Sequence, residues 1–255
     1  MPKVSIITPC YNSAKYIAAT IDSIKAQTFE DWELLITDDC STDDTVAIVE
    51  SYAKDDERIK LFRLESNAGG GAARNNSIER ATGRYIAFCD SDDRWYPEKL
   101  AKQLAFMEER DCAFSYTSYM TCFEDGVIKG IVICPHRETL RSNLRDSKIG
   151  CLTAMYDTEK VGKVYLPLIR KRQDWGLMIR ILQRCGVAYG MKEPLALYRL
   201  REGSISSNKL DLVKYNIGVY RQVLGWSGVR STLFFLLVFM PSYLKKKYIV
   251  RLYNK

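Results

Sequence analysis

Residues 86–93 read Ile-Ala-Phe-Cys-Asp-Ser-Asp-Asp, an apolar run that changes abruptly into a cluster of acids. The run Tyr85–Cys89 has the length and composition of a buried strand. Asp90, Asp92 and Asp93 follow it, and like charges at such short spacing raise one another's pKa unless a cation or ligand neutralises them. Mg²⁺ and Mn²⁺ prefer carboxylate oxygens and leave positions open for phosphates. A divalent metal site is therefore favoured over a plain polar turn, which needs one Asp and not three.

Two earlier segments also run from an apolar strand into polar residues. Val4–Asn12 is a strand followed by a turn, and the helix after it is expected to be capped by Asn12 or Ser13. Trp32–Asp39 is a second such strand, and Ser41–Asp44 opens the next helix. Open α/β sheets bind ligands at the carboxyl ends of their strands. Four side chains are expected to converge there: Tyr11, Asp39, Asp90 and Asp92.

At these residues the chain resembles the family 2 glycosyltransferases, which have the GT-A fold. Four motifs carry the resemblance in the family's order: Val-Ser-Ile-Ile-Thr-Pro-x-Tyr-Asn (4–12), Asp-Asp-x-Ser-Thr-Asp (38–43), Asn-x-Gly with Ala-Arg-Asn (67–75) and Asp-Ser-Asp-Asp (90–93). The resemblance implies an α/β fold with a Rossmann-like nucleotide-binding half and a mixed central sheet flanked by helices. We expect residues 1–110 to form the nucleotide-sugar-binding half, residues 111–210 the acceptor-binding half of the same domain, and residues 211–255 a basic amphipathic helical tail.

The resemblance also implies roles for the first half. Tyr11, presented by the turn at Pro9, corresponds to the residue that stacks on uracil; alone it would more often be a core residue. Asp39 corresponds to the carboxylate that accepts the uracil N–H, with Asp38 as its neighbour. Asp92 corresponds to the ligand of Mn²⁺ or Mg²⁺, and Asp93 is a candidate cap for the next helix. The positions expected to bind the nucleotide are Pro9, Tyr11, Asn12, Asp38, Asp39, Asn67, Gly70, Arg74, Asp90 and Ser91.

Residues 67–74 form a glycine-rich approach to a helix, where a backbone can come close to phosphate. The run lacks the Gly-Lys-Ser/Thr of a Walker loop, and by itself it is equally consistent with an ordinary loop. Arg74 lies one turn into the expected helix. We expect it to reach the diphosphate or the sugar.

Asp174 is the candidate general base, in the sequence Arg-Lys-Arg-Gln-Asp-Trp at 170–175. A carboxylate that opens a helix is often only a cap or a dipole partner, but the family places its base at this position. The Gln-x-x-Arg-Trp signature of processive synthases is absent, which favours transfer of a single sugar. Arg199 and Arg201 lie in Tyr198–Ser206, which resembles a donor-closing loop without the histidine of many relatives. They are candidates for diphosphate binding, and a basic surface loop is the alternative.

Charge divides the chain unevenly. Residues 1–110 hold 14 Lys and Arg against 20 Asp and Glu, whereas residues 111–255 hold 24 against 11. The first half should therefore bind a cation, and the second an anionic surface or ligand. A nucleic-acid ligand is excluded, because no nucleic-acid-binding motif is present. The most linker-like stretch is 124–147, around an expected turn at Glu124-Asp125-Gly126.

The C-terminal segment suggests a membrane surface. Leu233–Met240 is a run of eight apolar residues before Pro241 and three lysines. A membrane-spanning helix needs roughly 20 apolar residues, so we expect residues 230–255 to lie in the interface of an anionic membrane. The side chains expected to insert are Phe234, Phe235, Leu237 and Phe239. Packing on the protein's own core, or on a second subunit of an oligomer, is the alternative.

The cysteines indicate a reducing compartment. None of the eight forms a Cys-x-x-Cys pair, and the N-terminus does not resemble a signal peptide, so we expect free buried thiols. His136 is the only histidine, which argues against a structural zinc site. The expected location is the cytoplasm, peripheral at the inner face of the plasma membrane.

The expected activity is an inverting, metal-dependent transfer of one sugar from a UDP-sugar to a lipid-linked or oligosaccharide acceptor in cell-surface polysaccharide synthesis. The second half is most similar to teichuronic-acid-type transferases. One alternative is a nucleotide-sugar nucleotidyltransferase, but such enzymes favour a basic N-terminal signature, and Lys15 is the first basic residue after the opening turn. A non-catalytic nucleotide-sugar-binding protein is the other alternative.

Overall fold

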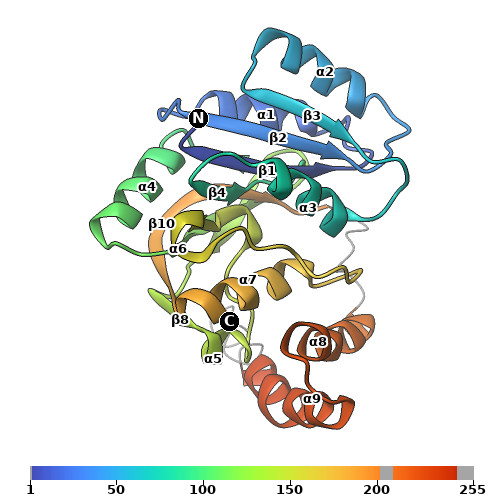
Figure 1. Cartoon of the computed structure of the whole chain (residues 1–255), viewed down its shortest axis with the longest axis vertical. Helices are drawn as coiled ribbons and strands as arrows, with labels where there is room; N and C mark the ends of the chain where they lie inside the picture. Colours follow the sequence, from blue (N-terminus) through green and yellow to red (C-terminus); the bar gives the residue numbers. More distant parts are fainter. Residues whose placement is uncertain (1, 202–208, 246–255) are drawn as a thin grey trace.

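The computed structural model describes residues 2–201 and 209–245, and within them ten strands form one mixed sheet (Figure 1). Its order is β3-β2-β1-β4-β9-β6-β10-β5, with β7 paired to β6 and β8 to β10. The strands are β1 (Val4–Cys10), β2 (Trp32–Asp38), β3 (Ile59–Arg63), β4 (Tyr85–Phe88), β5 (Arg94–Trp95), β6 (Phe114–Cys122), β7 (Ile128–Val132), β8 (Arg137–Thr139), β9 (Met155–Asp157) and β10 (Val187–Arg199).

Helices cover both faces of this sheet. They are α1 (Ile17–Lys25), α2 (Thr45–Asp55), α3 (Gly70–Arg80), α4 (Lys99–Glu109), α5 (Leu140–Asn143), the 3₁₀ helix η1 (Cys151–Thr153), α6 (Thr158–Val161), α7 (Gln173–Cys185), α8 (Lys209–Leu224), α9 (Gly228–Phe234) and the π-helix η2 (Phe235–Phe239). The buried residues of α1, α2 and α4 form one core with the sheet. Those of α3, α6 and α7 form a second core on the other face.

The N-terminal half of the sheet is parallel. β1 pairs with β2 and β4, and β2 pairs with β3, all in the same direction. Every residue of β1 and β2 is buried. A parallel strand covered on both faces is expected to be a continuous apolar run, which is why these strands could be recognised from the sequence.

The C-terminal half makes the sheet mixed. β9 lies antiparallel between β4 and β6, β10 runs parallel to β6, and β5 pairs antiparallel with β10. This arrangement confirms the expected mixed α/β sheet flanked by helices. The stretch 124–147 is more ordered than a linker: it contains the turn at Gly126, where φ is +89°, and then β7, β8 and α5.

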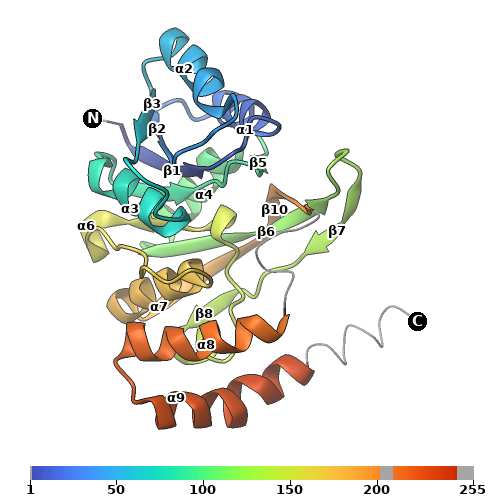
Figure 2. The ribbon, with the colours of Figure 1, turned by 90° about the vertical axis from the view of Figure 1, so that its right-hand side faces the viewer.

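The C-terminal helices build a third core. α7, α8 and α9 follow one another away from the sheet (Figure 2), and the aromatic residues between them include Trp175 and Tyr220. Phe235 and Phe239 are only 2% and 7% exposed in this core, so the prediction that they insert into a membrane is wrong. Leu237, in contrast, is 71% exposed. No helix in residues 2–201 or 209–245 is long and apolar enough to cross a bilayer.

Two predicted helix caps are also wrong. α1 begins only at Ile17, with Tyr16 at its N-cap and no capping side chain. The Asn12 side chain instead accepts a hydrogen bond from the Thr42 amide at 2.8 Å. α4 has Glu98 at its N-cap, so Asp93 does not cap it. The expected free thiols are confirmed, since all eight cysteines are unpaired and six of them are buried.

Candidate active site

The predicted nucleotide residues lie at one edge of the sheet, where β1, β2 and β4 end. The register places Cys10 beside Asp38, so the two strands finish together. Tyr11 follows at once and is 50% exposed. Because the Tyr11 ring is not packed in the core, it is available to stack on a flat ligand.

Hydrogen bonds between loops give this edge its shape. The backbone N–H of Asn12 donates to Ser41 Oγ at 2.9 Å. The Ser13 and Ser91 hydroxyls lie 2.8 Å apart. Asp38 is buried and accepts hydrogen bonds from the backbone amide and the hydroxyl of Ser41, at 3.0 and 2.5 Å. The three loops that follow β1, β2 and β4 are therefore linked to one another.

Asp39 is buried and organises the glycine-rich segment. Its two carboxylate oxygens accept hydrogen bonds from the amides of Ala68 at 2.7 Å and Gly69 at 2.8 Å. The Asn67 side chain donates to the Asp39 carbonyl at 3.0 Å, and Gly69 has a φ of +87°, which favours glycine. Each carboxylate oxygen has a second lone pair, so these bonds leave Asp39 able to accept a further N–H.

The acidic cluster is neutralised in part by two arginines. Arg74 contacts Asp90 at 2.5 Å, and Arg201 Nε lies 2.6 Å from Asp92 Oδ2. Burial and the neighbouring Asp90 nevertheless raise the pKa of Asp92 above its ordinary value, against the opposing effect of Arg201. The fully buried Asp93 accepts a hydrogen bond from the Arg199 amide at 3.0 Å, and burial followed by the charge of Asp92 raises its pKa much further.

The donor set fits a divalent cation that is held mainly by its substrate. Over residues 2–201 and 209–245, no three Asp, Glu, His or Cys side chains come together as a metal cage. Asp92 offers a carboxylate whose pKa is raised first by burial and then by the charge of the neighbouring Asp90, which a bound cation would offset. Mg²⁺ is commonly bound through one or two carboxylates together with phosphate oxygens and water, and Asp92 meets that requirement.

Arg199 and Arg201 have different surroundings. Arg199 is 8% exposed, and its guanidinium donates to the carbonyls of Asp92 at 3.0 Å and Glu124 at 2.9 Å. It therefore fastens the acidic loop to the turn before β7. Arg201 keeps more than a third of its side chain exposed beside Asp92. The rest of the predicted donor loop, residues 202–206, lies outside the described residues.

Asp174 approaches the same edge from the other half of the chain. It lies in the first turn of α7, just after Arg172 with its positive φ of 66°. Burial would lower the pKa of Arg74, but Asp90 and, less strongly, Asp174 raise it above its ordinary value. Arg74 is thus in the field of both carboxylates.

Close packing of α3 on α7 makes this approach possible. A Cβ added at Gly71 would lie 2.9 Å from the side chain of Gln173, the first residue of α7. Glycine therefore lets the start of α3 come against the start of α7. The candidate base and the candidate diphosphate residues are held together by this contact.

A further group around Tyr16 was not predicted. The Tyr16 hydroxyl donates to Glu124 Oε2 at 2.7 Å, and Lys15 pairs with the same carboxylate. The guanidinium carbons of Arg199 and Arg201 lie 5.2 and 5.6 Å from the centre of the Tyr16 ring. These residues support the two arginines, but no motif connects positions so distant in the sequence.

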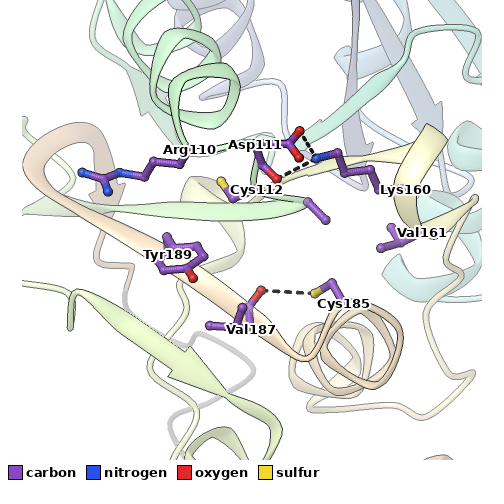
Figure 3. Close-up of a pocket in the computed structure, with 9 residues that line it drawn as sticks. Arg110, Asp111, Cys112, Lys160, Val161, Cys185, Val187 and Tyr189 are labelled. Carbon is purple, nitrogen blue, oxygen red and sulfur yellow. Dashed lines mark hydrogen bonds and ion pairs between the residues drawn. The ribbon is translucent and has the colours of Figure 1, made fainter.

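A half-open cavity lies away from all of these residues (Figure 3). It has a volume of about 320 Å³ and opens where β6 and β10 begin, at the opposite edge of the sheet. Lys160 pairs with Asp111 across it, and the Cys185 thiol donates to the Val187 carbonyl. Its lining contains none of the predicted site residues, so the cavity gives no support to the nucleotide site.

Comparison with known proteins identifies the family. Residues 5–158 match the sequence model of "Glycosyl transferase family 2". The chain belongs to this family. It is therefore an enzyme, a glycosyltransferase, and membership favours this activity over the nucleotidyltransferase and the non-catalytic binding protein considered from the sequence.

Relatives and a solved structure agree with the assignment. The chain is 48% identical over 223 residues to TuaG of Bacillus subtilis (strain 168), whose name assigns it to teichuronic acid biosynthesis, covering 87% of this chain and 88% of TuaG. It is 37% identical over 212 residues to WfgD of Escherichia coli, named as a UDP-Glc:alpha-D-GlcNAc-diphosphoundecaprenol beta-1,3-glucosyltransferase, covering 83% and 82%. A crystal structure of residues 1–349 of S. aureus TarS with UDP-GlcNAc superposes with a TM-score of 0.71 and 24% identity. The match covers 90% of this chain and 69% of that TarS chain, which supports the GT-A fold.

Proposed function

We propose that this glycosyltransferase moves one sugar from a UDP-sugar to a lipid-linked or oligosaccharide acceptor in cell-surface polysaccharide synthesis, with inversion at the anomeric carbon. The observation that carries the proposal is the ion pair of Arg74 with Asp90 at the edge where the nucleotide residues gather, together with the packing of Gln173, the neighbour of Asp174, against Gly71. The names of TuaG and WfgD support the envelope pathway and the lipid-linked acceptor.

The donor side binds the uridine diphosphate. Tyr11 stacks on the base, and Asp39 accepts the ring N–H with the lone pairs that its two backbone hydrogen bonds leave available. Asp90 lies beside the ribose, with Arg74 oriented by its ion pair to reach the diphosphate. Residues 1–110 supply this half of the site, and residues 111–210 supply the acceptor half.

Asp92 is the residue that would hold Mn²⁺ or Mg²⁺ in the presence of the diphosphate. A bound divalent ion would stabilise the negative charge that develops on the departing UDP. Binding of the ion would require Arg201 to release Asp92, and the freed guanidinium could then contact a phosphate oxygen. The chain thus supplies one carboxylate and two arginines around the leaving group.

Asp174 acts on the acceptor. Its carboxylate takes the proton of the acceptor hydroxyl while that oxygen attacks the anomeric carbon from the face opposite the diphosphate. The carbon–oxygen bond to the β-phosphate breaks with its electron pair, and UDP leaves. One base suffices, because the anomeric carbon is attacked once.

Substitution of Asp174 tests this assignment. The Asp174→Asn variant should bind UDP with near-wild-type affinity in calorimetry, because the carboxamide conserves shape and Asp174 does not contact the nucleotide in this proposal. Its transfer rate should fall by about 100-fold or more, since it lacks a general base. Asp55→Asn, exposed at the end of α2, is the matched control and should behave as wild type.

Three results would separate parts of the proposal. An Asp174→Asn variant that keeps most of its transfer rate would show that the base lies elsewhere. UDP release across a panel of UDP-sugars identifies the donor. Release that survives EDTA and the Asp92→Ala change would remove the metal from the mechanism while leaving the transferase in place.

The acceptor suggests where the reaction takes place. If the acceptor is lipid-linked, the enzyme works in the cytoplasm at the inner face of the plasma membrane, as a peripheral protein. The basic C-terminal half, with 24 Lys and Arg against 11 Asp and Glu in residues 111–255, supports contact with an anionic surface. Residues 246–255 of the predicted membrane segment lie outside the described residues.

A further inference from the structure

The C-terminal helix has a second apolar side that faces outward. Along α9, η2 and the helical residues 240–245 that follow, five large side chains are exposed on one side of the helix. We call them the leucine face: Val229, Leu233, Leu236, Leu237 and Leu244. Val229 and Leu237 are each 71% exposed, while Phe235 and Phe239 on the inner side are buried. A helix that is apolar on both sides is normally covered on both sides.

A groove adjoins the leucine face. It has a volume of about 390 Å³ and lies between α5 and the C-terminal helix, lined by Leu140, Arg141, Leu144, Arg145, Phe234 and Val238. Arg141 and Arg145 are four residues apart and exposed. Among the described residues neither of them has an ion pair, so both guanidinium groups are available to an anion beside an apolar slot.

Charge selects the partner that covers this surface. After Asp211 the sequence holds eight basic residues and no acid, among them Arg230 and Lys245 on the same helix. In a two-fold contact between copies the same patch meets itself, so these cations would face one another without a compensating acid from this segment. An anionic surface meets both the charge and the apolar side chains.

We propose that the leucine face and its groove dock on an anionic lipid bilayer. The leucines enter the boundary between headgroups and acyl chains, and Arg141 and Arg145 bind lipid phosphate oxygens at the mouth of the groove. This face differs from the phenylalanines that the sequence suggested, because Phe235 and Phe239 are used internally.

Docking has a consequence for the acceptor. Trp175, next to Asp174, packs on Phe239 and Tyr220 with ring centres 5.5 and 5.4 Å away. Trp175 of the helix that carries the candidate base thus reaches the helix that carries the leucine face, while α8 lies between α7 and α9 (Figure 2). On a bilayer, α8 and α9 lie between α7 and the lipid, so the sugar of a lipid-linked acceptor is presented above the bilayer while its lipid stays in the membrane. This last step rests on the proposed function; docking itself does not.

The test is co-sedimentation of the full chain with sucrose-loaded vesicles. On vesicles of equal parts phosphatidylglycerol and phosphatidylcholine, the Leu233→Ser/Leu236→Ser/Leu237→Ser variant should bind about tenfold or more weakly than wild type, since each leucine loses apolar burial. Arg141→Gln/Arg145→Gln should weaken binding to these vesicles without changing the fold. The difference in vesicle affinity between this variant and wild type should disappear at high salt. Binding of wild type to pure phosphatidylcholine should be weaker.

The matched control replaces exposed apolar residues elsewhere. Val127→Ser/Ile128→Ser/Ile131→Ser removes three exposed side chains at β7 and should leave vesicle binding unchanged. UDP affinity and a thermal melt confirm that each variant is folded. Two outcomes would overturn the proposal. In the first, the leucine-face variants bind vesicles as wild type does. In the second, wild type does not bind vesicles, whether light scattering shows a monomer or a dimer that the leucine substitutions dissociate. UDP release to a soluble acceptor is measured separately, so loss of docking with intact transfer leaves the proposed function standing.

Discussion

Asp92 and Arg201 set up a competition at the scale of single residues. The carboxylate proposed to hold a divalent cation already contacts a guanidinium, 2.6 Å from Arg201 Nε. The notion that three adjacent acids require a metal is therefore too simple, because the protein supplies positive charge of its own. A divalent ion has to displace Arg201 from Asp92 before it gains that ligand.

This competition predicts that Arg201→Gln binds Mn²⁺ more tightly than wild type in the absence of nucleotide. A partly exposed ion pair contributes about 1 kcal/mol or less, so the gain should be severalfold at most. Electron paramagnetic resonance of free Mn²⁺ measures it directly and does not depend on turnover. Arg110→Gln, near the distant cavity, is the control. Equal Mn²⁺ affinity for wild type and Arg201→Gln would mean that the ion pair does not oppose the metal.

Lys99 makes a second prediction at this scale, on the pH dependence of stability. It is fully buried, with its ammonium nitrogen 3.9 Å from the centre of the Trp95 ring and 2.8 Å from Gln103 Oε1. Burial lowers its pKa from 10.5 to about 7. Between these values the unfolded chain binds a proton that the folded protein releases, so the contribution of Lys99 to the free energy of unfolding rises with pH.

Urea unfolding from neutral to alkaline pH measures the effect. The free energy of unfolding of wild type minus that of Lys99→Met should increase with pH across the window from about 7 to 10.5, by up to about 5 kcal/mol. Below pH 7, where Lys99 is charged inside the folded protein, the free energy of unfolding of wild type is lowest relative to that of Lys99→Met. Lys54→Met, at the exposed end of α2, should show no such slope. A flat difference for Lys99→Met would show that the buried lysine keeps its ordinary pKa.

The motif residues could be predicted individually from the sequence, but the residues that hold them in place could not. Tyr11, Asp39 and Asp90 follow strands that the apolar runs identify, so their convergence could be predicted from strand ends alone. The contacts of Tyr16 with Glu124, and of Arg199 with the Glu124 carbonyl, join residues far apart in the sequence. Nothing local in the sequence encodes such a pair.

At the scale of elements, the C-terminal helix divides its apolar residues between two sides. Phe235→Ala should lower the free energy of unfolding by about 3 to 5 kcal/mol, because it leaves a cavity beside Trp175 and Tyr220. Leu236→Ala is the matched neighbour, 52% exposed, and should change it by about 0.5 kcal/mol or less. Urea unfolding compares the two. Similar losses for both variants would contradict the assignment of inner and outer sides.

The sequence could predict this helix but not its orientation. Leu233–Met240 is uniformly apolar, so no helical period marks which side packs inward. The inner side is selected by Trp175 and Tyr220, which reach the helix from α7 and α8. The cap of α1 failed for a related reason: the Asn12 side chain bonds to the Thr42 amide of the neighbouring loop instead of to its own helix.

At the scale of the whole molecule, the first half was more predictable than the second. Parallel strands between helices produce strong local patterns, and these define the nucleotide edge. The second half depends on β9 and on the long irregular β10, whose register with β6 shifts near Met191 and Pro194. The proximity of Asp174 to Arg74 is a product of this tertiary arrangement, and only the family resemblance pointed to it.

The three-residue strand β9 has a consequence for how the molecule comes apart. Met155–Asp157 hydrogen-bonds to β4 on one side and to β6 on the other, although it comes after both in the chain. The N-terminal and C-terminal halves of the sheet cannot separate without breaking the pairing of β9, which would expose the edge of β4 or of β6. We expect such an arrangement to couple the unfolding of the two halves and to make an isolated N-terminal fragment less stable. During synthesis, the nucleotide half must wait, with the edge of β4 uncovered, until about residue 157 has emerged from the ribosome.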